Sequence, residues 1–330
     1  MSIVVSGVRP TGNLHLGNYY GAITNFLKMQ ERNKCYFFIA DLHSLTTHPD
    51  PKMLHTNVRN ILSEYLACGI DPEKAAIYMQ SDIPEIVQLY LLLNMLAPIA
   101  ELKKTVSFKD KIRKNPENIN AGLFTYPVLM AADILIFNAN YVPVGKDQEQ
   151  HLELTRNYAS RFNHRYNVNY FNQPTAYIFD KELIEIPGLN GSGKMGKSES
   201  NCIYLVDTPQ IIEKKVRSAL TDNGPVGENT PKPDYIENLF TLLRAVSTPE
   251  VVSYYENLWI VGATKWYSNL KKQLAEDIIK LTIPIRQRVN DIRNDDTYLR
   301  KVTQEGAEKA KETARKTLKE VKQLMGFKSF

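Results

Sequence analysis

The stretch IVVSGVRPTGNLHLGNYYGA, residues 3–22, decides the fold. It opens with the short apolar run 3–7, which ends in a glycine and is typical of a buried strand. One proline and two glycines then permit a tight turn, and a helical pattern follows over 17–32, with apolar residues three and four apart. We expect Gly17 and Asn18 to begin this helix, where the free N–H groups of its first turn favour an anion.

The same alternation continues beyond this stretch. The run CYFFIAD (35–41) predicts a second strand, residues 53–68 a second helix and AAIYMQSD (75–82) a third strand. Strands and helices that alternate at this spacing predict an α/β fold, a parallel sheet with crossover helices. Ligands of such sheets bind beyond the carboxyl ends of the strands. Polar residues follow each predicted strand there, in the segments 6–11, 41–43 and 80–82.

The second half of the chain has a different character. From about residue 209 onward it is mostly helical by pattern, with apolar residues three and four apart in 209–220, 234–246 and 265–289. The last segment, 305–327, predicts a Lys-rich amphipathic helix with a solvated charged face. We therefore expect two domains, 1–200 and 201–330, with the last helix packing back on the first domain.

Composition excludes several classes of protein. Three cysteines, Cys35, Cys68 and Cys202, lie far apart and form no zinc, iron–sulfur or disulfide pattern. No apolar run approaches the roughly 18 residues that a membrane helix needs. The N-terminus has no basic region before an apolar stretch, so we expect a cytoplasmic protein with no membrane partner. The formal net charge of +5 permits a nucleic-acid partner without requiring one.

The stretch GSGKMGKS (191–198) matches the P-loop pattern G-x-x-x-x-G-K-[ST]. A P-loop follows a strand directly and opens a helix. Here Pro187 and Gly188 end a short run before the stretch, and ESNCIYLVDTPQ after it contains a strand-like piece and no helix. The alternative is a mobile phosphate-binding loop, in which Lys194 and Lys197 stabilise charge on a leaving pyrophosphate.

Two motifs in this order carry a family resemblance. HLGN (15–18) and KMGKS (194–198) resemble the HIGH and KMSKS motifs of class I aminoacyl-tRNA synthetases. Further stretches make the chain similar, over nearly its whole length, to the bacterial tryptophanyl-tRNA synthetase family. They are PTGNLHLGNY (10–19), IADLHSLT (39–46), YPVLMAADIL (126–135) and VPVGKDQEQHLELTR (142–156).

The resemblance implies a fold, a reaction and partners. Residues 1–200 would form a Rossmann-type catalytic domain, and residues 201–330 a mainly helical anticodon-binding region. The carboxylate of L-tryptophan would attack the α-phosphorus of ATP, giving tryptophanyl-adenylate and pyrophosphate. The tryptophan would then pass to the 3′ end of tRNA(Trp). Mg²⁺ would travel with the ATP phosphates, and the family acts as a homodimer.

The resemblance also implies site residues. Those expected to carry the chemistry are His15, Lys109, Lys194 and Lys197. Those expected to bind ATP are Arg9, Pro10, Thr11, Gly17, Asn18, Gly145, Lys146, Asp147, Ile186, Lys194, Met195, Gly196, Lys197 and Ser198. Those expected to bind tryptophan are Gly7, His43, Tyr126, Met130, Asp133, Val142, Val144 and Gln148.

Elementary chemistry fits the tryptophan assignments. Tyr126, Met130 and Asp133 are four and three residues apart, so they share one helical face. The indole N–H is a donor only, and a carboxylate such as that of Asp133 is a fitting acceptor. Alternatively, Asp133 pairs with a protein donor or faces water. Two further residues also have a structural alternative to their binding roles. Asp147 would serve as a plain helix N-cap, and Gly7 would serve only as part of a backbone turn.

The sequence departs from the family pattern at several positions. Asn18 replaces the second histidine of HIGH, as is usual in the tryptophanyl enzymes. Gly196 replaces the serine of KMSKS, so one hydroxyl contact to the phosphates is lost while the backbone N–H remains. Arg9 stands where glutamine is commoner, Lys146 replaces an acidic residue, and the segment 185–193 differs from a common bacterial form.

Three other functions are weighed against this one. The tyrosyl-tRNA synthetases share the motifs, but usually place a tyrosine on the first strand, where this chain has Val5. A P-loop nucleotide switch would require a helix directly after residues 191–198, and the sequence there predicts none. A non-catalytic RNA-binding relative is disfavoured because both motif loops keep their charged or polar side chains.

Overall fold

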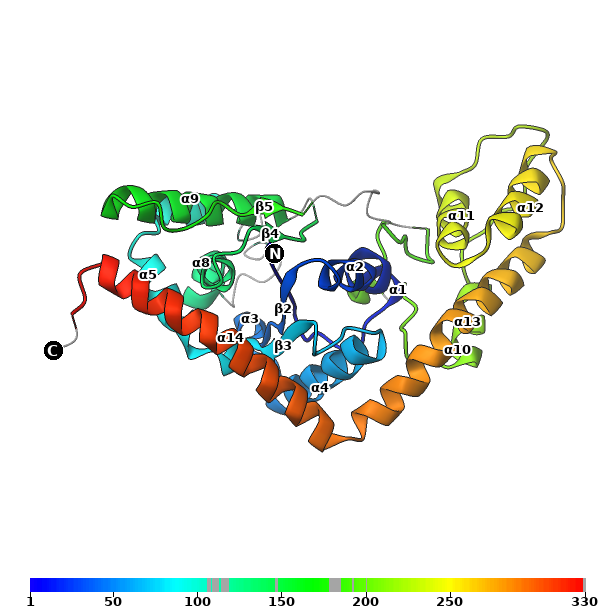
Figure 1. Ribbon diagram of the computed structural model, residues 1–330. Coiled ribbons are helices and arrows are strands. Elements are labelled where there is room, and N and C mark those ends of the chain that lie inside the picture. Colours follow the sequence, from blue (N-terminus) through cyan, green and yellow to red (C-terminus); the bar gives the residue numbers. More distant parts are fainter. Residues whose placement is uncertain are drawn as a thin grey trace.

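The computed structural model describes residues 1–105, 108, 113, 119–145, 148–177, 185–191, 193–199 and 201–328, with only the backbone of Ser198. These residues contain a five-stranded parallel sheet with helices on both sides, which confirms the expected α/β fold (Figure 1). The strand order is β3 (Ala75–Met79), β2 (Lys34–Ile39), β1 (Ile3–Val8), β4 (Tyr141–Val142) and β5 (Thr175–Ala176).

The central strands are buried on both faces. β1 and β2 run in register from the pair Ile3 and Lys34 to the pair Val8 and Ile39. Tyr36 and Phe38 of β2 pack into one apolar core, whereas Phe37 and Ile39 pack into another on the opposite face. Near-continuous apolar strands of this kind are typical of parallel sheets with helices on both faces.

The first crossover is a helix with an irregular centre. It consists of α1 (Leu16–Asn18), a π-helical segment (Tyr19–Ile23) and α2 (Thr24–Gln30), and so begins one residue before the range expected from the sequence. The second crossover contains α3 (Asp41–Ser44) and α4 (Pro51–Ala67). The side chain of Asp50 accepts the Met53 N–H at 3.0 Å, and Pro51 occupies the first turn, so the start of α4 is well capped.

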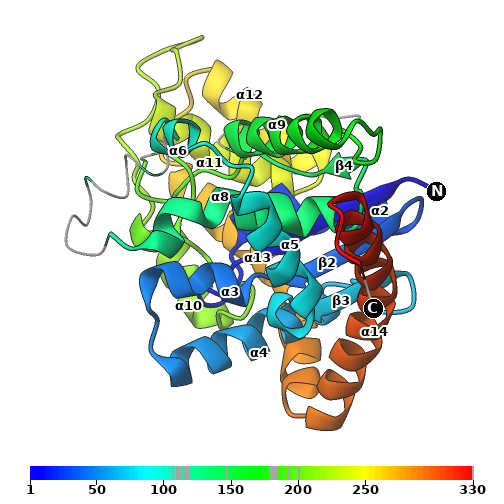
Figure 2. The ribbon, with the colours of Figure 1, turned by 90° about the vertical axis from the view of Figure 1, so that its left-hand side faces the viewer.

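One face of the sheet is covered by helices from distant parts of the chain. They are α5 (Pro84–Asn94), α6 (Ile99–Lys103), α8 (Ala121–Leu135), α9 (Glu149–Tyr166) and α14 (Asp296–Leu324). Figure 2 shows α14 alongside β3, and the Tyr36 hydroxyl on β2 lies 2.8 Å from that of Thr313 on α14. α14 packs closely on β3 because it carries Gly306. A Cβ added there would lie 1.9 Å from the carbonyl oxygen of Ile77 on β3.

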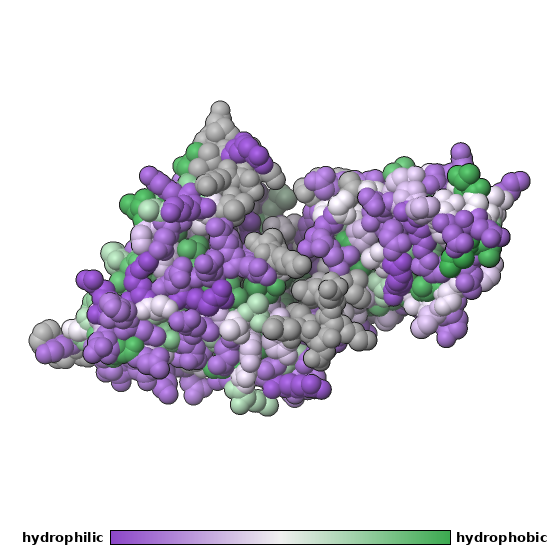
Figure 3. Space-filling view, turned by 90° about the horizontal axis from the view of Figure 1, so that it is seen from above, coloured by the Kyte–Doolittle hydropathy of each residue, from purple (hydrophilic) through white to green (hydrophobic). Residues whose placement is uncertain are grey.

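The remaining helices form a lobe beside the sheet half. They are α10 (Pro209–Arg217), α11 (Asp234–Val246), α12 (Pro249–Ile260) and α13 (Tyr267–Arg293). We call them the helical lobe. α13 leaves this lobe, packs against α4 and meets α14 at a sharp vertex, from which α14 returns across the sheet half (Figure 1). From above, the lobe projects to one side of the sheet half, and both have largely hydrophilic surfaces (Figure 3).

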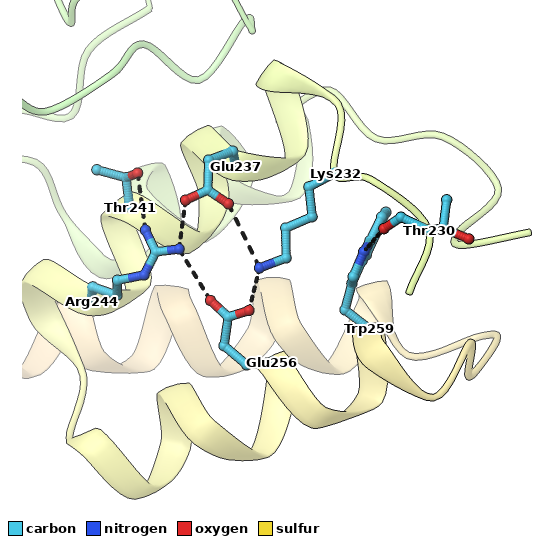
Figure 4. Close-up of polar contacts among 7 residues, drawn as sticks. All are labelled: Thr230, Lys232, Glu237, Thr241, Arg244, Glu256 and Trp259. Atoms are coloured by element: carbon cyan, nitrogen blue, oxygen red, sulfur yellow. Dashed lines mark hydrogen bonds and ion pairs between the residues drawn. The ribbon is translucent and has the colours of Figure 1, made fainter. Parts of the chain in front are cut away.

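Ion pairs join the helices of the lobe. Lys232 contacts Glu256 and lies 3.6 Å from Glu237, while Arg244 bonds Glu237 at 2.5 Å and Glu256 at 3.1 Å (Figure 4). The ammonium group of Lys232 also lies 3.8 Å from the ring centroid of Phe240. We call Lys232, Glu237, Arg244 and Glu256 the ion-pair cluster. It ties the segment before α11 and the last turn of α11 to the middle of α12.

Some sequence expectations differ from the structure. The third strand ends at Met79, because Gln80–Asp82 turn into a 3₁₀-helix. Between residues 201 and 208 there is no strand, only one isolated bridge between Tyr204 and His15. Within the described ranges, no helix is long and apolar enough to span a membrane.

Candidate active site

His15 caps the helix that follows β1. Its Nδ1 accepts the Asn18 N–H at 3.3 Å, and the Asn18 side-chain oxygen accepts the His15 N–H at 3.1 Å. The helix therefore begins at Leu16, one residue before the expected start at Gly17. Because Nδ1 is an acceptor, the ring proton sits on Nε2, which is then a donor. Burial, together with the charges of Lys197 and Lys194, lowers the pKa of His15 to about 4, so the ring is neutral at physiological pH.

The two motif loops meet at this histidine. A Cβ added to Gly17 would lie 3.5 Å from the Met195 Cβ, in ordinary contact with the second loop, but 2.9 Å from the His15 ring, so a side chain there would displace that ring. The ammonium of Lys197 donates to the Gly12 carbonyl at 3.0 Å, and burial lowers its pKa.

Other predicted nucleotide ligands surround this junction. Lys197 also lies 3.3 Å from the Thr11 hydroxyl, and Pro10 is buried beside it in the chain. Lys194 is exposed, close enough for its charge to act on His15. Burial lowers the pKa of Arg9, and its buried Nε has no hydrogen-bond partner among the described residues. The structure thus brings Lys194 and Lys197 of the second loop to His15 of the first, while Arg9 lines the neighbouring cavity.

A residue that sequence reasoning missed, Asn201, holds the second loop. Its side-chain oxygen accepts the Gly196 N–H at 2.9 Å, and its Nδ2 donates to the Asn190 side chain at 3.1 Å. Gly188 has to be glycine, since a Cβ there would lie 2.0 Å from the Asn201 Nδ2. The Gly196 N–H, expected to serve the phosphates, is therefore engaged and must leave Asn201 before it can reach them.

The same loop does not have P-loop geometry. Lys197–Glu199 form a single 3₁₀ turn, and α10 begins only at Pro209. On the other side, Lys194 pairs with Pro187 in an isolated antiparallel bridge. The Met195 N–H donates to the Ile186 carbonyl at 2.9 Å, and the Ile186 side chain is packed in the core, which leaves its backbone for any contact with adenine.

A cavity of about 390 Å³ opens at the carboxyl ends of β1 and β2, beside α8. Arg9 and Gly145, expected at the nucleotide, line it as well. All the residues expected to bind tryptophan contribute to its wall, namely Gly7, His43, Tyr126, Met130, Asp133, Val142, Val144 and Gln148.

Asp133 is the buried charge of this cavity. Its side chain is 1% exposed, and its oxygens accept hydrogen bonds from Gln80 Nε2 at 2.8 Å and from His43 Nε2 at 2.9 Å. Burial raises the pKa of Asp133, while the contacts with His43 and Gln80 oppose that shift. The pairing with protein donors considered from the sequence is therefore present, and the same carboxylate also faces the cavity.

One alternative for an individual residue is wrong. Gly7 lies inside β1 and serves no turn; a Cβ there would lie 2.5 Å from the Phe38 ring, so glycine admits the ring to the cavity wall. Lys109, Lys146 and Asp147 themselves lie outside the described residues, as does the side chain of Ser198.

A second residue missed by the sequence analysis is Glu64 on α4. It is fully buried, and its Oε2 accepts the Leu14 N–H at 2.5 Å, next to His15. Arg293, at the vertex of α13 and α14, lies 3.6 Å from its Oε1. Burial raises the pKa of Glu64 to about 7, against the opposing effects of Leu14, Arg293 and Lys197. A lone glutamate within an amphipathic helix gives no sequence signal for this role.

Comparison with known proteins decides between the related families. The sequence profile described as tRNA synthetases class I (W and Y) matches residues 1–282. The chain belongs to this family. A tryptophan–tRNA ligase of Porphyromonas gingivalis is 56% identical over 328 residues, covering 99% of the chain and 100% of the relative. That of Clostridium tetani is 39% identical over 327 residues, covering 98% and 95%.

A solved structure agrees with these family relatives. The crystal structure of tryptophanyl-tRNA synthetase from Campylobacter jejuni, complexed with ADP and tryptophan, is 31% identical, with a TM-score of 0.87, and covers 99% of this chain and 100% of its own. The expected membership of the bacterial tryptophanyl-tRNA synthetase group is confirmed. Tryptophan–tRNA ligase function is supported over the tyrosyl alternative.

Proposed function

We propose that this tryptophan–tRNA ligase activates L-tryptophan with ATP at the junction of the two motif loops and then charges tRNA(Trp). In the first step a tryptophan carboxylate oxygen forms a bond to the α-phosphorus of ATP, and the bond to pyrophosphate breaks. In the second step the adenylate passes its acyl group to the terminal ribose of the tRNA, releasing AMP. No protein nucleophile is needed, so positioning and charge stabilisation carry the rate.

The observation that carries the proposal is the buried carboxylate of Asp133 in the cavity wall. An ionised carboxylate has about four acceptor positions. Gln80 and His43 each supply one donor, so acceptor positions are left for an indole N–H. Tyr126 and Met130, from the same helix, line the cavity beside Asp133. A mainly apolar wall with a buried carboxylate suits an aromatic ring that carries a single N–H donor.

The nucleotide is proposed to lie across His15 and the two lysines of the second loop. Neutral His15 would donate its Nε2–H to a phosphoryl oxygen, and Lys194 and Lys197 would stabilise charge on the leaving pyrophosphate. Lys197 would exchange its bond to Gly12 for one to a phosphate, and Gly196 would leave Asn201. The loop therefore has to move when ATP binds.

Mg²⁺ is proposed to arrive with the ATP phosphates. Among the described residues, no group of three or more His, Cys, Asp or Glu side chains is placed to hold a metal ion. Magnesium is commonly held by substrate phosphates and water instead of an all-protein cage. Its chemistry would be to neutralise charge on the triphosphate.

The helical lobe is proposed to bind the anticodon end of tRNA(Trp), within the region 201–330. Residues 1–200 would then form the catalytic domain, with α14 returning to it from the lobe. tRNA charging also implies a cytoplasmic location. Unstacked bases are generally read by side chains that stack on them or bond to their edges.

A homodimer is proposed on the evidence of an apolar stripe on α5 and the start of α6. Val87, Leu91, Met95 and Ile99 recur every four residues and are 46%, 56%, 72% and 62% exposed. Exposed apolar side chains of this size favour a protein–protein contact. Sedimentation equilibrium should find a dimer for the wild type and a monomer for Leu91→Glu. A wild-type monomer at micromolar concentration contradicts the proposal.

The experiment that tests the proposed function is ATP–pyrophosphate exchange with tryptophan, with tyrosine or with neither, beside phosphate release from ATP alone. We expect exchange with tryptophan only. Exchange with tyrosine would instead assign the pocket to the sister amino acid. Phosphate release with no amino acid and no exchange would refute the activation step altogether.

A further inference from the structure

Gln80 lies directly behind Asp133, outside the cavity wall. It is the first residue of the 3₁₀ turn after β3, and its side chain is fully buried. Its Nε2 donates to Asp133 Oδ1 at 2.8 Å, and its Oε1 accepts the backbone N–H of His43 at 3.3 Å. The His43 ring closes the arrangement with its bond to Asp133 Oδ2 at 2.9 Å.

These contacts leave only one orientation for the Gln80 amide. The His43 backbone N–H is a donor, so it requires the amide oxygen. The amide NH₂ must then point at Asp133, which in its ionised form only accepts. Gln80 thus supplies Asp133 with a donor of fixed direction and adds no charge to the buried site. Hydrogen bonds to the ionised carboxylate favour that form against the cost of burial.

We propose that Gln80 is a positioning residue that sets the preference of the pocket for an indole N–H, acting through Asp133. The inference rests on the proposed function, in which Asp133 accepts that N–H. Without Gln80, one oxygen of a buried carboxylate loses its donor. The carboxylate is then free to turn towards His43 or to take up a proton, and either change weakens it as an acceptor for the substrate. Gln80 is not part of the cavity wall, and its other bond to the site, from the His43 backbone N–H, serves both substrates alike.

The test compares two substrates that differ in the one relevant group. L-Tryptophan is measured against β-(1-benzothiophen-3-yl)-L-alanine, in which sulfur replaces the ring N–H. The readout is the ratio of the two kcat/KM values in ATP–pyrophosphate exchange, for the wild type, Gln80→Met and Ser81→Ala. Ser81 is the matched control because it is the next residue of the same turn, and its hydroxyl bonds Asp41 instead of Asp133.

We expect the wild type to prefer tryptophan by several powers of ten, as sites built around a substrate N–H do. In Gln80→Met this preference should fall by roughly ten- to hundredfold, because tryptophan loses activity and the analogue does not. The KM for ATP should stay unchanged, and Ser81→Ala should keep the wild-type ratio. If Gln80→Met does not fold, Gln80→Asn keeps the amide but is one methylene too short to reach Asp133, and it should show the same loss of preference.

The outcomes separate the inference from the function on which it rests. If the wild type uses both substrates equally, the contact between Asp133 and the indole fails, and the role of Gln80 fails with it. If the wild type prefers tryptophan and Gln80→Met lowers both activities by the same factor, Gln80 is only structural and this inference is overturned. Purely structural damage moves both substrates together and leaves the ratio in place.

Discussion

The sheet half and the helical lobe each contain a carboxylate that faces two donors, yet the two sites are built differently. Asp133 is 1% exposed and meets His43 and Gln80, whereas Glu256 is 26% exposed and meets Lys232 and Arg244. Breaking a buried pair costs much because the remaining group stays desolvated. Exposed pairs contribute little because water replaces the lost partner. Burial, more than the number of contacts, therefore decides how much each carboxylate matters.

The largest effect is expected for Asp133→Asn. The change keeps the shape of the side chain but removes its charge and one acceptor, so tryptophan loses its proposed partner and His43 loses its own. We expect kcat/KM for tryptophan to fall on the order of 10³-fold, with the KM for ATP nearly unchanged. ATP–pyrophosphate exchange measures both, and Glu256→Gln should leave both as in the wild type. An equal loss for tryptophan and ATP would contradict the pocket assignment.

Packing in the sheet half should be the next most sensitive feature. In Gly306→Ala the new Cβ would overlap the Ile77 carbonyl oxygen, so α14 must move away from β3. We expect a loss of about 3 kcal/mol in the free energy of unfolding, measured by urea denaturation. Gly21→Ala is the matched control, since its Cβ would meet open space, and it should be neutral or slightly stabilising. Equal stability of the two variants would rule out the close contact between α14 and β3.

A smaller effect is expected from acidification, which acts on the histidines of the sheet half. All histidines lie before residue 165, and the helical lobe has none. Native His15 has a pKa of about 4, whereas an unfolded histidine has one of about 6.5. As the pH falls from 6.5 towards 4, the unfolded chain takes up a proton that the native chain does not, so the stability from neutral His15 present above pH 6.5 is lost.

The comparison with His15→Asn isolates this effect, since asparagine also caps a helix but does not titrate. The urea midpoint of the wild type should fall more between pH 7 and pH 5 than that of His15→Asn. The same fall in both proteins would show that another group controls the acid sensitivity.

The sequence predicted those parts of the molecule that depend on local pattern. The strand over 3–7 follows from a short apolar run, the helix over 53–68 from apolar periodicity, and the shared face of Tyr126, Met130 and Asp133 from their spacing. The structure contains each of them. The grouping of residues around the cavity came from a family resemblance, because no local pattern relates His43 on one crossover to Asp133 on another.

The partners that hold the site in place were not predictable in this way. Gln80, Glu64 and Asn201 act through contacts with residues far away in the chain or with backbone N–H groups, and their residue types are common on any surface. The capping role of His15 was missed for a different reason, since histidine is rarely an N-cap residue. Only the folded arrangement shows that these polar side chains are buried.

The smallest effect is expected for Glu256→Gln in the ion-pair cluster. The change removes one charge, but Lys232 keeps its place over the Phe240 ring, and Arg244 keeps its bond to Glu237. We expect a loss of less than about 1 kcal/mol in the free energy of unfolding at low salt, and a smaller loss in 1 M NaCl, where exposed charges are screened. Urea denaturation at both salt concentrations measures the two losses, with Glu276→Gln as a control for an exposed i,i+4 pair with Lys272. A loss of several kcal/mol that does not respond to salt would mean that Glu256 behaves like Asp133, and the contrast between the two carboxylates would fail.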